Sequence, residues 1–229
     1  MKIGFISDIH SNIYAFKSML KNMEELSVDE ILCCGDIVGY NTFSNECLEI
    51  VRESHIQSVL GNHDWATLSG DTSWFNQYGV AGVEYCRKNI NENNMRFLQE
   101  LPTNKSFELE GISFYMTHGS PRDNIFEYVF PWSSNNVFKT FAEMIDAEVI
   151  VLGHTHIPME KRVGGKIFLN PGSVGQPRDG ISDASFLVFD TKKRICKWHR
   201  IAYDIDAVAR SIRENGLTSF SAERLYLGQ

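Results

Sequence analysis

The sequence predicts an α/β fold in which two packed sheets are flanked by helices. Short apolar runs alternate with segments of helical periodicity over residues 2–60, and strands dominate the C-terminal half. Residues that can bind a metal ion come immediately after several of these apolar runs, so we expect them to converge along one edge of a sheet. Alternating strands and helices that give way to successive strands are typical of packed sheets covered by helices.

The N-terminal part predicts three strands and two helices. Residues 2–7 (KIGFIS) are a short apolar run, the pattern of a buried strand. Asn12 is placed to cap a helix whose apolar positions recur at helical spacing. These positions are Phe16, Met19, Leu20, Met23 and Leu26. Further strands are predicted at 29–34 and 56–60, with a helix over about 44–53 between them.

The rest of the chain predicts one irregular segment and a strand-rich half. Residues 65–90 are aromatic and interrupted by Gly79 and Gly82, so we interpret them as an aromatic lobe beside the active site. The residues from 204 to 229 predict a helical C-terminal appendage, and the whole chain, 1–229, reads as one domain. Helices are predicted near 91–100 and 137–145, and strands near 104–109, 112–117, 148–152, 166–169, 184–190 and 194–202.

Composition and charge narrow the function classes. The 229 residues suffice for a substantial core, and hydrophobic and charged contents of 43% and 22% are ordinary for a globular protein. No apolar run approaches the roughly 18 residues of a membrane helix, and Asp8 interrupts the N-terminal run too early for a signal peptide. Five scattered cysteines contain no C-x-x-C pair, so we expect a cytoplasmic protein without a membrane partner.

The formal charge of −7 argues against a nucleic-acid polymer as partner, because such proteins usually carry a basic face. It does not argue against a phosphorylated small molecule, since bound divalent cations would reverse the local field.

The first two motifs with metal-binding side chains follow predicted strands. Asp8 and His10 are two residues apart, a spacing at which strand side chains point the same way. Asp36 follows Gly35, which allows a sharp turn after the run ILCC. Each motif alone has a structural alternative: Asp8 could cap a helix beside a surface histidine, and Gly-Asp is a common turn.

The next three motifs add an amide and three imidazoles. In GNHD (61–64), Asn62 offers a neutral oxygen ligand and His63 a general acid, although Asn and Asp also favour turns. His118 alone after a strand is weak evidence, whereas His154 and His156 after VIVL are hard to explain as packing. The seven candidate ligands are Asp8, His10, Asp36, Asn62, His118, His154 and His156, enough for two metal ions.

The joint spacing of the motifs is more specific than any one motif. Twenty-four residues separate His10 from Gly35, and 24 separate Asp36 from Gly61. The ordered blocks Asp-x-His, Gly-Asp, Gly-Asn-His-Asp, a post-strand His and Gly-His-x-His resemble the signature of the calcineurin-like metallophosphoesterase superfamily. The chain looks similar to its small, mostly prokaryotic phosphodiesterase branch in SDIHSN (7–12), GDIVGY (35–40), HGSPR (118–122) and NPGSVGQPRDG (170–180).

This resemblance implies a four-layer α-β-β-α sandwich of two mixed sheets with a dinuclear metal site. Asp8, His10, Asp36 and His156 would hold one ion. Asp36, Asn62, His118 and His154 would hold the other, so that Asp36 bridges the two. A hydroxide between the ions would attack phosphorus in line, and His63 would protonate the leaving oxygen or stabilise the phosphoryl group. Mn²⁺ is the expected metal, with Fe, Zn²⁺, Ni²⁺ and Co²⁺ as alternatives.

One departure from the family pattern concerns His63. The protein Ser/Thr phosphatase branch has an Asp three residues after the bridging Asp, followed by an Arg, whereas this chain has Gly39 and Tyr40. Another group must therefore orient His63, and a phosphoprotein substrate is disfavoured. Arg178 and Asn12 are the candidate substrate contacts; the alternatives are a structural ion pair for Arg178 and a helix cap for Asn12.

We therefore expect a metal-dependent phosphoric ester hydrolase acting on a small phosphodiester or phosphomonoester, of nucleotide type. Aromatic residues in 65–90 and 125–132 could stack on a base or pack in the lobe core. One alternative is a catalytically silent protein-binding scaffold, as in a retromer subunit of this fold, but all the ligands are intact. The other is a nuclease, disfavoured by the acidic charge. The sequence leaves the oligomeric state open.

Overall fold

The first sheet is mixed and contains the N-terminal strands. The computed structural model describes all residues, 1–229. This sheet has the order β10-β9-β1-β2-β3, in which β1, β2 and β3 are parallel and β9 and β10 are antiparallel to their neighbours. Its strands are β1 (Lys2–Ile6), β2 (Glu30–Cys33), β3 (Gln57–Ser58), β9 (Ala184–Asp190) and β10 (Ile195–Ile201).

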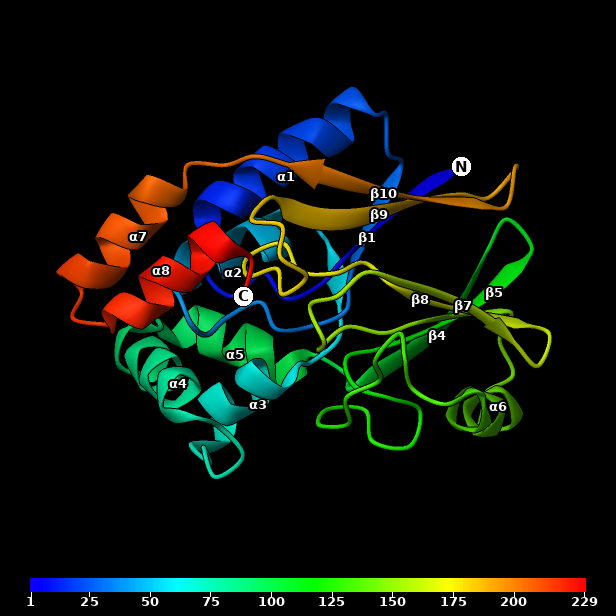
Figure 1. The fold of residues 1–229 in the computed structure, drawn as a ribbon, viewed down its shortest axis with the longest axis horizontal. Coiled ribbons are helices and arrows are strands. Elements are labelled where there is room, and N and C mark those ends of the chain that lie inside the picture. The colour runs from blue at the N-terminus through cyan, green and yellow to red at the C-terminus, as the bar shows by residue number, and fades with distance from the viewer.

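The second sheet is built from the middle of the chain and faces the first (Figure 1). Its order is β4-β5-β6-β8-β7, with β5, β6 and β8 parallel and the outer strands antiparallel. Its strands are β4 (Asn104–Leu109), β5 (Ile112–Thr117), β6 (Val149–Val151), β7 (Met159–Val163) and β8 (Lys166–Asn170). The predicted fold class, two mixed sheets flanked by helices, is confirmed.

Eight helices cover the sheets and one end of the molecule. In Figure 1, α6 lies against the second sheet, while α7 and α8 lie at the same end as α3, α4 and α5. The helices are α1 (Ile13–Glu25), α2 (Ser44–Glu53), α3 (Asn62–Ser69), α4 (Gln77–Asn89), α5 (Glu92–Glu100), α6 (Asn135–Met144), α7 (Ile205–Glu214) and α8 (Ser219–Leu227).

Strand alternation divides the core into layers. Ile3 and Phe5 of β1 face the inter-sheet core, where Phe5 packs against Phe114 with ring centroids 5.8 Å apart. Ile6 points to the other face and joins the layer beneath α1 and α2. A third cluster lies between the second sheet and α6 and includes Phe138 and Phe168. This arrangement follows from side chains alternating between the two faces of a strand.

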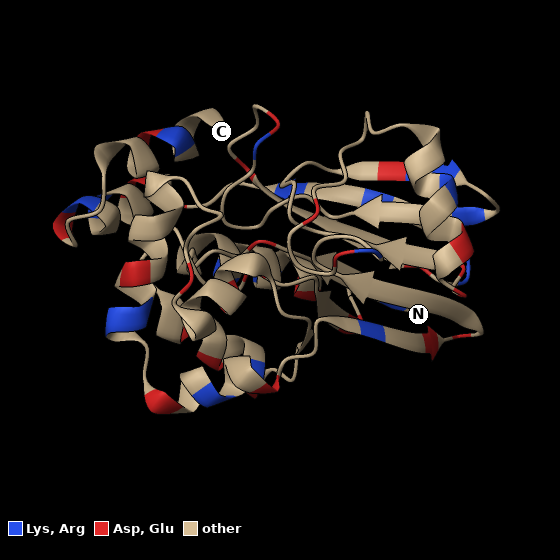
Figure 2. Cartoon of the chain, turned by 90° about the horizontal axis from the view of Figure 1, so that it is seen from below, with Lys and Arg blue, Asp and Glu red and all other residues tan.

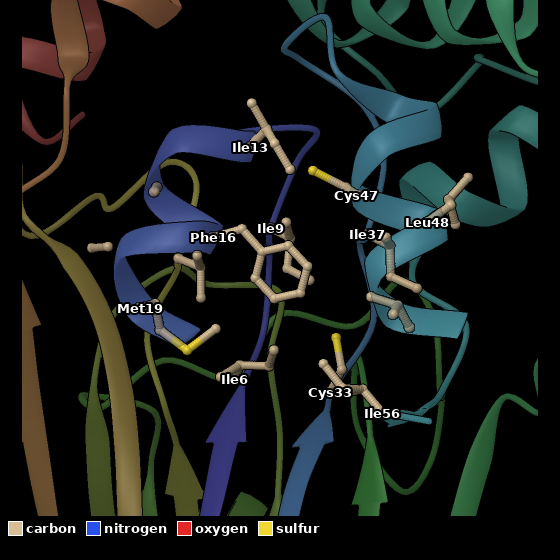
Figure 3. Packing of buried hydrophobic residues seen from close by; sticks show 14 of the residues in the cluster. Ile6, Ile9, Ile13, Phe16, Met19, Cys33, Ile37, Cys47, Leu48 and Ile56 are labelled. Carbon is tan, nitrogen blue, oxygen red and sulfur yellow. The ribbon is translucent and has the colours of Figure 1, made fainter. Parts of the chain in front are cut away.

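Figure 3 shows the layer between the first sheet and its two helices. Phe16 and Met19 of α1 point toward Ile6 and Ile9, and Cys47 and Leu48 of α2 lie across from them (Figure 3). The other buried thiols, Cys33, Cys34 and Cys86, are free, as is the half-buried Cys196. This layer holds the loops after β1 and β2 against the helices, and those loops carry the first two motifs.

The structure differs from the predicted elements in three places. Residues 65–90 are not irregular, because α3 and α4 cover most of them. Gly82 lies inside α4 because the helix touches the backbone of Tyr40; an added Cβ would meet Tyr40 N at 2.4 Å. The strand β7, whose exposed side chains are charged, was not predicted, and β3 is shorter than the strand predicted at 56–60. The predicted cap of α1 is confirmed, since Asn12 Oδ1 accepts a hydrogen bond from Ala15 N.

Two further features of the chain are the distribution of its charged residues and the apolar character of its helices. Lys and Arg are interspersed with Asp and Glu along the helices and strands in Figure 2. None of the helices combines the length and apolar character that crossing a bilayer requires.

Candidate metal centre

The candidate ligands lie in loops at the carboxyl ends of strands from both sheets. Asp8 and His10 follow β1, and Asp36 follows β2. Asn62 begins α3 just after β3, His118 follows β5, and His154 and His156 follow β6. The expectation that the ligands line the edge of one sheet is therefore corrected: the centre lies across the strand ends of two sheets that face each other.

Left-handed backbone, rather than strand alternation, directs many of these side chains. The φ angles are 55° at Asp8, 46° at His10, 55° at Asp36, 68° at His154 and 60° at His156. Such angles are uncommon for residues other than glycine and cost on the order of 1–3 kcal/mol each. They persist because the loops bind one another, as Asp8 N donates to Gly35 O and His10 N to Asp36 O, both at 3.0 Å. Strained backbone gathered at these five residues indicates a functional site.

Each buried carboxylate uses one oxygen for the backbone and turns the other toward imidazoles. Asp8 Oδ2 accepts from His154 N at 3.1 Å, and Asp36 Oδ1 accepts from His63 N at 2.8 Å. Asp8 Oδ1 then lies 3.2 Å from His156 Nε2. Asp36 Oδ2 lies 3.6 Å from His10 Nε2 and 3.4 Å from His118 Nε2. Asp36 therefore reaches both halves of the cluster.

Backbone carbonyls select the tautomers of the four imidazoles. The Nδ1–H of His10 donates to Val38 O at 3.0 Å, and that of His118 to Cys34 O at 2.8 Å. His156 donates from Nδ1 to Gln176 O, and His154 from Nε2 to Phe126 O. A carbonyl can only accept, so each ring keeps its proton on that side and presents the other nitrogen inward as a lone pair. Metal-binding histidines are commonly held this way.

The inward nitrogens come too close to one another to be left without a cation. His10 Nε2 lies 3.1 Å from His156 Nε2, and His118 Nε2 lies 3.1 Å from His154 Nδ1. Asp8 Oδ1 is buried and has no hydrogen-bond partner. Lone pairs facing carboxylates in a buried space are stabilised by a divalent cation, and mixed imidazole and carboxylate sets suit several transition metals. The residues therefore fit metal ions.

Three groups of side chains place one ligand atom each within 4.8 Å of one another. They are Asp8, His10 and His156; Asp36, His118 and His154; and His10, Asp36 and His63. The first two groups fall within the two ligand sets that the resemblance implies. These buried clusters indicate a site for divalent metal ions.

Burial and neighbouring opposite charges shift the pKa values of the central carboxylates and imidazoles in opposite directions. Burial raises the pKa of the Asp8 carboxyl, but the imidazole of His156 outweighs it and lowers the pKa to about 2. Burial lowers the pKa of His118, but Asp36 and Asp8 raise it to about 9, so that without a metal ion this ring also takes a proton on its inward nitrogen. A buried centre whose carboxylates stay ionised attracts cations.

The residues of GNHD (61–64) have three different roles. Asn62 is a candidate ligand, His63 is a candidate general acid, and Asp64 supports the surrounding backbone. Asn62 Oδ1 lies 2.9 Å from the inward Nε2 of His118, so it faces the same space as Asp36. Asp64 is fully buried and accepts hydrogen bonds from Val38 N and Gly61 N, both at 3.0 Å. Burial and the nearby Asp36 charge raise the pKa of Asp64 to about 7. Asp64 therefore ties the loop after β2 to the start of α3.

His63 is held by aromatic packing rather than by a hydrogen bond to its ring. Its centroid lies 4.4 Å from Tyr40, 4.6 Å from Phe75 and 4.7 Å from His10. Gly39, at φ +96°, leaves room for the ring, since an added Cβ would lie 2.4 Å from His63 Nδ1. His63 Nδ1 is buried without a partner. Burial lowers the pKa of His63 to about 4. The group that replaces the missing Asp of the phosphatase branch is thus an aromatic pair.

The two predicted substrate contacts differ. Asn12 is fully buried, caps α1 with Oδ1 and donates from Nδ2 to Gly175 O at 2.9 Å. The structure therefore shows the alternative role of Asn12, a helix cap, while a contact of its second Nδ2 hydrogen with substrate stays a prediction. Arg178 forms no ion pair; it donates to Tyr40 Oη at 3.1 Å and keeps Nε buried and unpartnered. Its guanidinium remains available to an anion.

Four further side chains surround the centre; the sequence analysis gave no role there to Tyr40 and Arg224, and it included Phe75 and Tyr128 only within the aromatic segments 65–90 and 125–132. Tyr128 stacks on the His154 ring with centroids 3.7 Å apart. Tyr40 and Phe75 hold His63, and Arg224 of α8 lies over the Tyr40 ring, 5.6 Å from its centroid. Tyr40 stood inside the quoted GDIVGY motif, which was a usable signal; Arg224 had none.

Some features lie away from the centre. His55 is exposed, and His199 stacks on Phe186 with centroids 5.1 Å apart, as expected of surface and packing residues. A surface hollow of about 640 Å³ is lined by residues such as Arg52, Phe97 and Lys105 and contains none of the candidate ligands. It brings together no cluster of metal-binding or nucleophilic side chains, so we do not assign it to the chemistry.

Comparison with known proteins agrees with this geometry. The family model described as the calcineurin-like phosphoesterase superfamily domain matches residues 1–194. The uncharacterized protein MJ0912 of Methanocaldococcus jannaschii is 37% identical over 244 residues, covering 99% of this chain and 98% of that protein. The phosphodiesterase MJ0936 of the same organism is 23% identical over 199 residues, covering 85% of this chain and 95% of that protein. The crystal structure of a metallophosphoesterase from Sphaerobacter thermophilus is 30% identical with a TM-score of 0.86, covering 100% of both chains.

Proposed function

The chain belongs to the calcineurin-like phosphoesterase superfamily, and on this basis we propose that it is a dinuclear-metal enzyme that hydrolyses a small, nucleotide-type phosphoester. Family membership and the buried Asp and His clusters make it a metal-dependent phosphoric ester hydrolase. We propose, in addition, that it binds two ions, that its substrate is of nucleotide type, and that its residues have the following roles.

The observation that carries the proposal is the position of Asp36. Its Oδ2 lies 3.6 Å from His10 Nε2 on one side and 3.4 Å from His118 Nε2 on the other. One carboxylate between two ligand groups suits a bridge between two ions. Asp8, His10 and His156 would complete one site, and Asn62, His118 and His154 the other. Two divalent cations would neutralise the phosphoryl oxygens and supply a hydroxide for in-line attack.

His63 is the proposed general acid. It is not needed as a ligand, because each site already has four protein donors once the bridging Asp36 is counted. Its ring lies 4.7 Å from that of His10, close enough to reach a phosphoester held at the metals. A proton delivered to the leaving oxygen contributes about 10²–10⁴-fold in rate in enzymes of many kinds. Tyr40 and Phe75 would keep the ring aimed at the substrate.

Two features support a nucleotide-type substrate. Trp74 is 75% exposed and lies 5.8 Å from Phe126, whose carbonyl holds His154. Tyr128, half exposed, stacks on His154 itself. These rings are not lobe core, so they can stack on a base beside the metals. Arg178 offers positive charge to the anionic part of the same substrate.

The alternatives have less support. A silent scaffold would be expected to have lost ligands, whereas all seven ligand positions and His63 are present and converge. A nuclease would favour a continuous basic face, and Figure 2 shows mixed charges instead. The relative named a phosphodiesterase supports the diester as the preferred bond.

The test is hydrolysis of bis(p-nitrophenyl) phosphate and p-nitrophenyl phosphate by metal-stripped protein with Mn²⁺ added back. We expect activity to rise until two ions are bound per chain, with the higher kcat/KM on the diester. Full activity at one ion per chain would contradict the dinuclear site. Two bound ions without turnover of either substrate would favour the scaffold. Activity on DNA or RNA that falls steeply with salt would favour the nuclease.

A further inference from the structure

Two guanidinium groups lie over one aromatic ring next to the metal centre. The guanidinium carbons of Arg178 and Arg224 are each 5.6 Å from the centroid of Tyr40. The same ring lies 4.7 Å from His10 and 4.4 Å from His63. Tyr40 is therefore shared between the proposed catalytic residues and a pair of positive charges. The two arginines come from the loop after β8 and from α8, which are far apart in sequence.

Neither arginine pairs with an acidic side chain. All ion pairs of the chain involve other residues; the neighbouring Asp179, for example, pairs with Arg200. The guanidinium of Arg178 donates only to the side chains of Tyr40 and Gln176, and Arg224 Nε donates to a backbone oxygen of Gln229, the last residue of the sequence. Both side chains are partly buried. Burial, followed by the positive charge of Arg178, lowers the pKa of Arg224 to about 10.

Two partly desolvated like charges without an acidic side chain between them are unfavourable unless an anion joins them. Arginine binds phosphate oxygens through parallel N–H groups and keeps its charge when partly buried. The buried Nε of Arg178, which lacks a partner, is one donor ready for such an anion. The feature is therefore a built cationic site, and not a pair of solvated surface side chains.

The C-terminal appendage is fastened so that Arg224 keeps this position. The hydroxyls of Thr42 and Ser211 are 2.6 Å apart, which fixes α7. Phe220 at the start of α8 stacks on Tyr78 of α4 with centroids 4.3 Å apart. At the other end of α8, Gly180 N donates to Gly228 O at 3.0 Å, so the helix is tied to the loop that carries Arg178.

We propose that Arg178 and Arg224 form a second anion subsite, which holds a phosphate group other than the one hydrolysed at the metals. This inference rests on the proposed function and narrows its substrate class to nucleotides that carry at least two phosphate groups. Arg178 lies within the family match and Arg224 beyond residue 194, where that match ends, so the C-terminal appendage supplies one of the two arginines of the subsite. Arg224 is a specificity-determining residue in this reading.

The experiment measures binding of AMP, ADP and adenosine 3′,5′-bisphosphate to Mn²⁺-loaded His63→Ala protein by calorimetry, with and without Arg224→Ala. His63→Ala slows turnover so that equilibrium binding can be followed. We expect ADP or the bisphosphate to bind about tenfold tighter than AMP, the scale of a charge-assisted contact. Arg224→Ala should remove that preference, and Arg224→Lys, which retains the charge, should keep part of it.

Arg210→Ala is the matched control, because Arg210 is an exposed arginine on α7 without an ion pair, and all affinities should stay the same. No preference for either second phosphate, or an equal loss for all three ligands in Arg224→Ala, would overturn the subsite. A preference that depends on Arg224 in a protein without phosphoesterase activity would support the subsite and overturn the proposed function. Hydrolysis of phosphoesters by a protein that shows no preference for a second phosphate would support the proposed function and overturn the subsite.

Discussion

The backbone N–H of His154 donates to Asp8 Oδ2 over 3.1 Å, across 146 residues of chain. Asp8 follows β1 of the first sheet and His154 follows β6 of the second, so this bond joins the sheets at the candidate metal centre. It also turns Asp8 Oδ1 toward His156, at 3.2 Å from Nε2. The position of the second sheet therefore decides where the first ligand points.

Metal content should separate the role of Asp36 from that of His63. Asp36→Asn removes the charge shared by both ligand groups, so we expect both ions to be lost together. His63→Ala should lower kcat by about 10²–10⁴-fold and leave metal content unchanged, because the ring is an acid and not a ligand. Metal analysis by mass spectrometry and steady-state kinetics measure the two effects. Equal metal loss in the two variants would contradict this division of roles.

Gly39→Ala should impair catalysis through His63. The new Cβ would lie 2.4 Å from Nδ1 of the imidazole, so the ring must move. Displacement by about 1 Å can reduce turnover by about 10²-fold, and we expect at least a tenfold lower kcat with both metals retained. Gly111→Ala is the control, since Gly111 also has a positive φ, +72°, but nothing within 4 Å of an added Cβ. Equal effects of the two substitutions would mean that backbone strain alone is responsible.

Removal of the metal ions should destabilise the fold. The centre holds ionised carboxylates and facing imidazole nitrogens, and these groups repel or remain unpaired without a cation. Ions at 100 times their dissociation constant stabilise the folded state by about 2.7 kcal/mol per site. Thermal unfolding with and without a chelator should therefore show a lower Tm for the stripped protein, restored by Mn²⁺. An unchanged Tm would argue that the cluster binds no metal tightly.

Trp74→Ala should weaken binding of a nucleotide substrate. A base stacked on an aromatic side chain contributes about 1–3 kcal/mol, so we expect a KM increase of about tenfold for a nucleotide ester. The KM for bis(p-nitrophenyl) phosphate should change much less. Trp132→Ala is matched in exposure, 71% against 75%, but stacks on Phe130 rather than on Phe126. If both variants behave alike, Trp74 is not the stacking residue.

Phe114→Ala should destabilise the packing between the sheets. Phe114 is nearly fully buried and contacts Phe5, Phe107 and Phe189. Removing a buried phenyl ring costs about 3–5 kcal/mol through lost transfer energy and the remaining cavity. The free energy of unfolding in urea measures this. Ile195→Ala, at a side chain that is 56% exposed, should stay within about 0.5 kcal/mol of the wild type.

Local pattern was sufficient for the elements whose periodicity is strong. The predicted strands at 104–109 and 112–117 and the helix at 44–53 have the bounds of β4, β5 and α2. Local pattern did not predict the structure where contacts with distant segments of the chain decide it. Gly82 signals a break locally, but the close approach of α4 to Tyr40 explains its presence inside a helix. The short edge strand β7 has charged outward side chains, so its apolar signal was weak.

The sequence by itself determined which residues can bind metal and in what order, because ligand chemistry and motif spacing are properties of the chain. Only the tertiary structure decided which nitrogen each histidine presents, since Val38, Cys34, Phe126 and Gln176 accept the other proton from separate loops. It also decided that Arg224 lies beside Tyr40. That placement depends on how α8 docks on α4 and on the loop after β8, contacts between distant segments that no local pattern records.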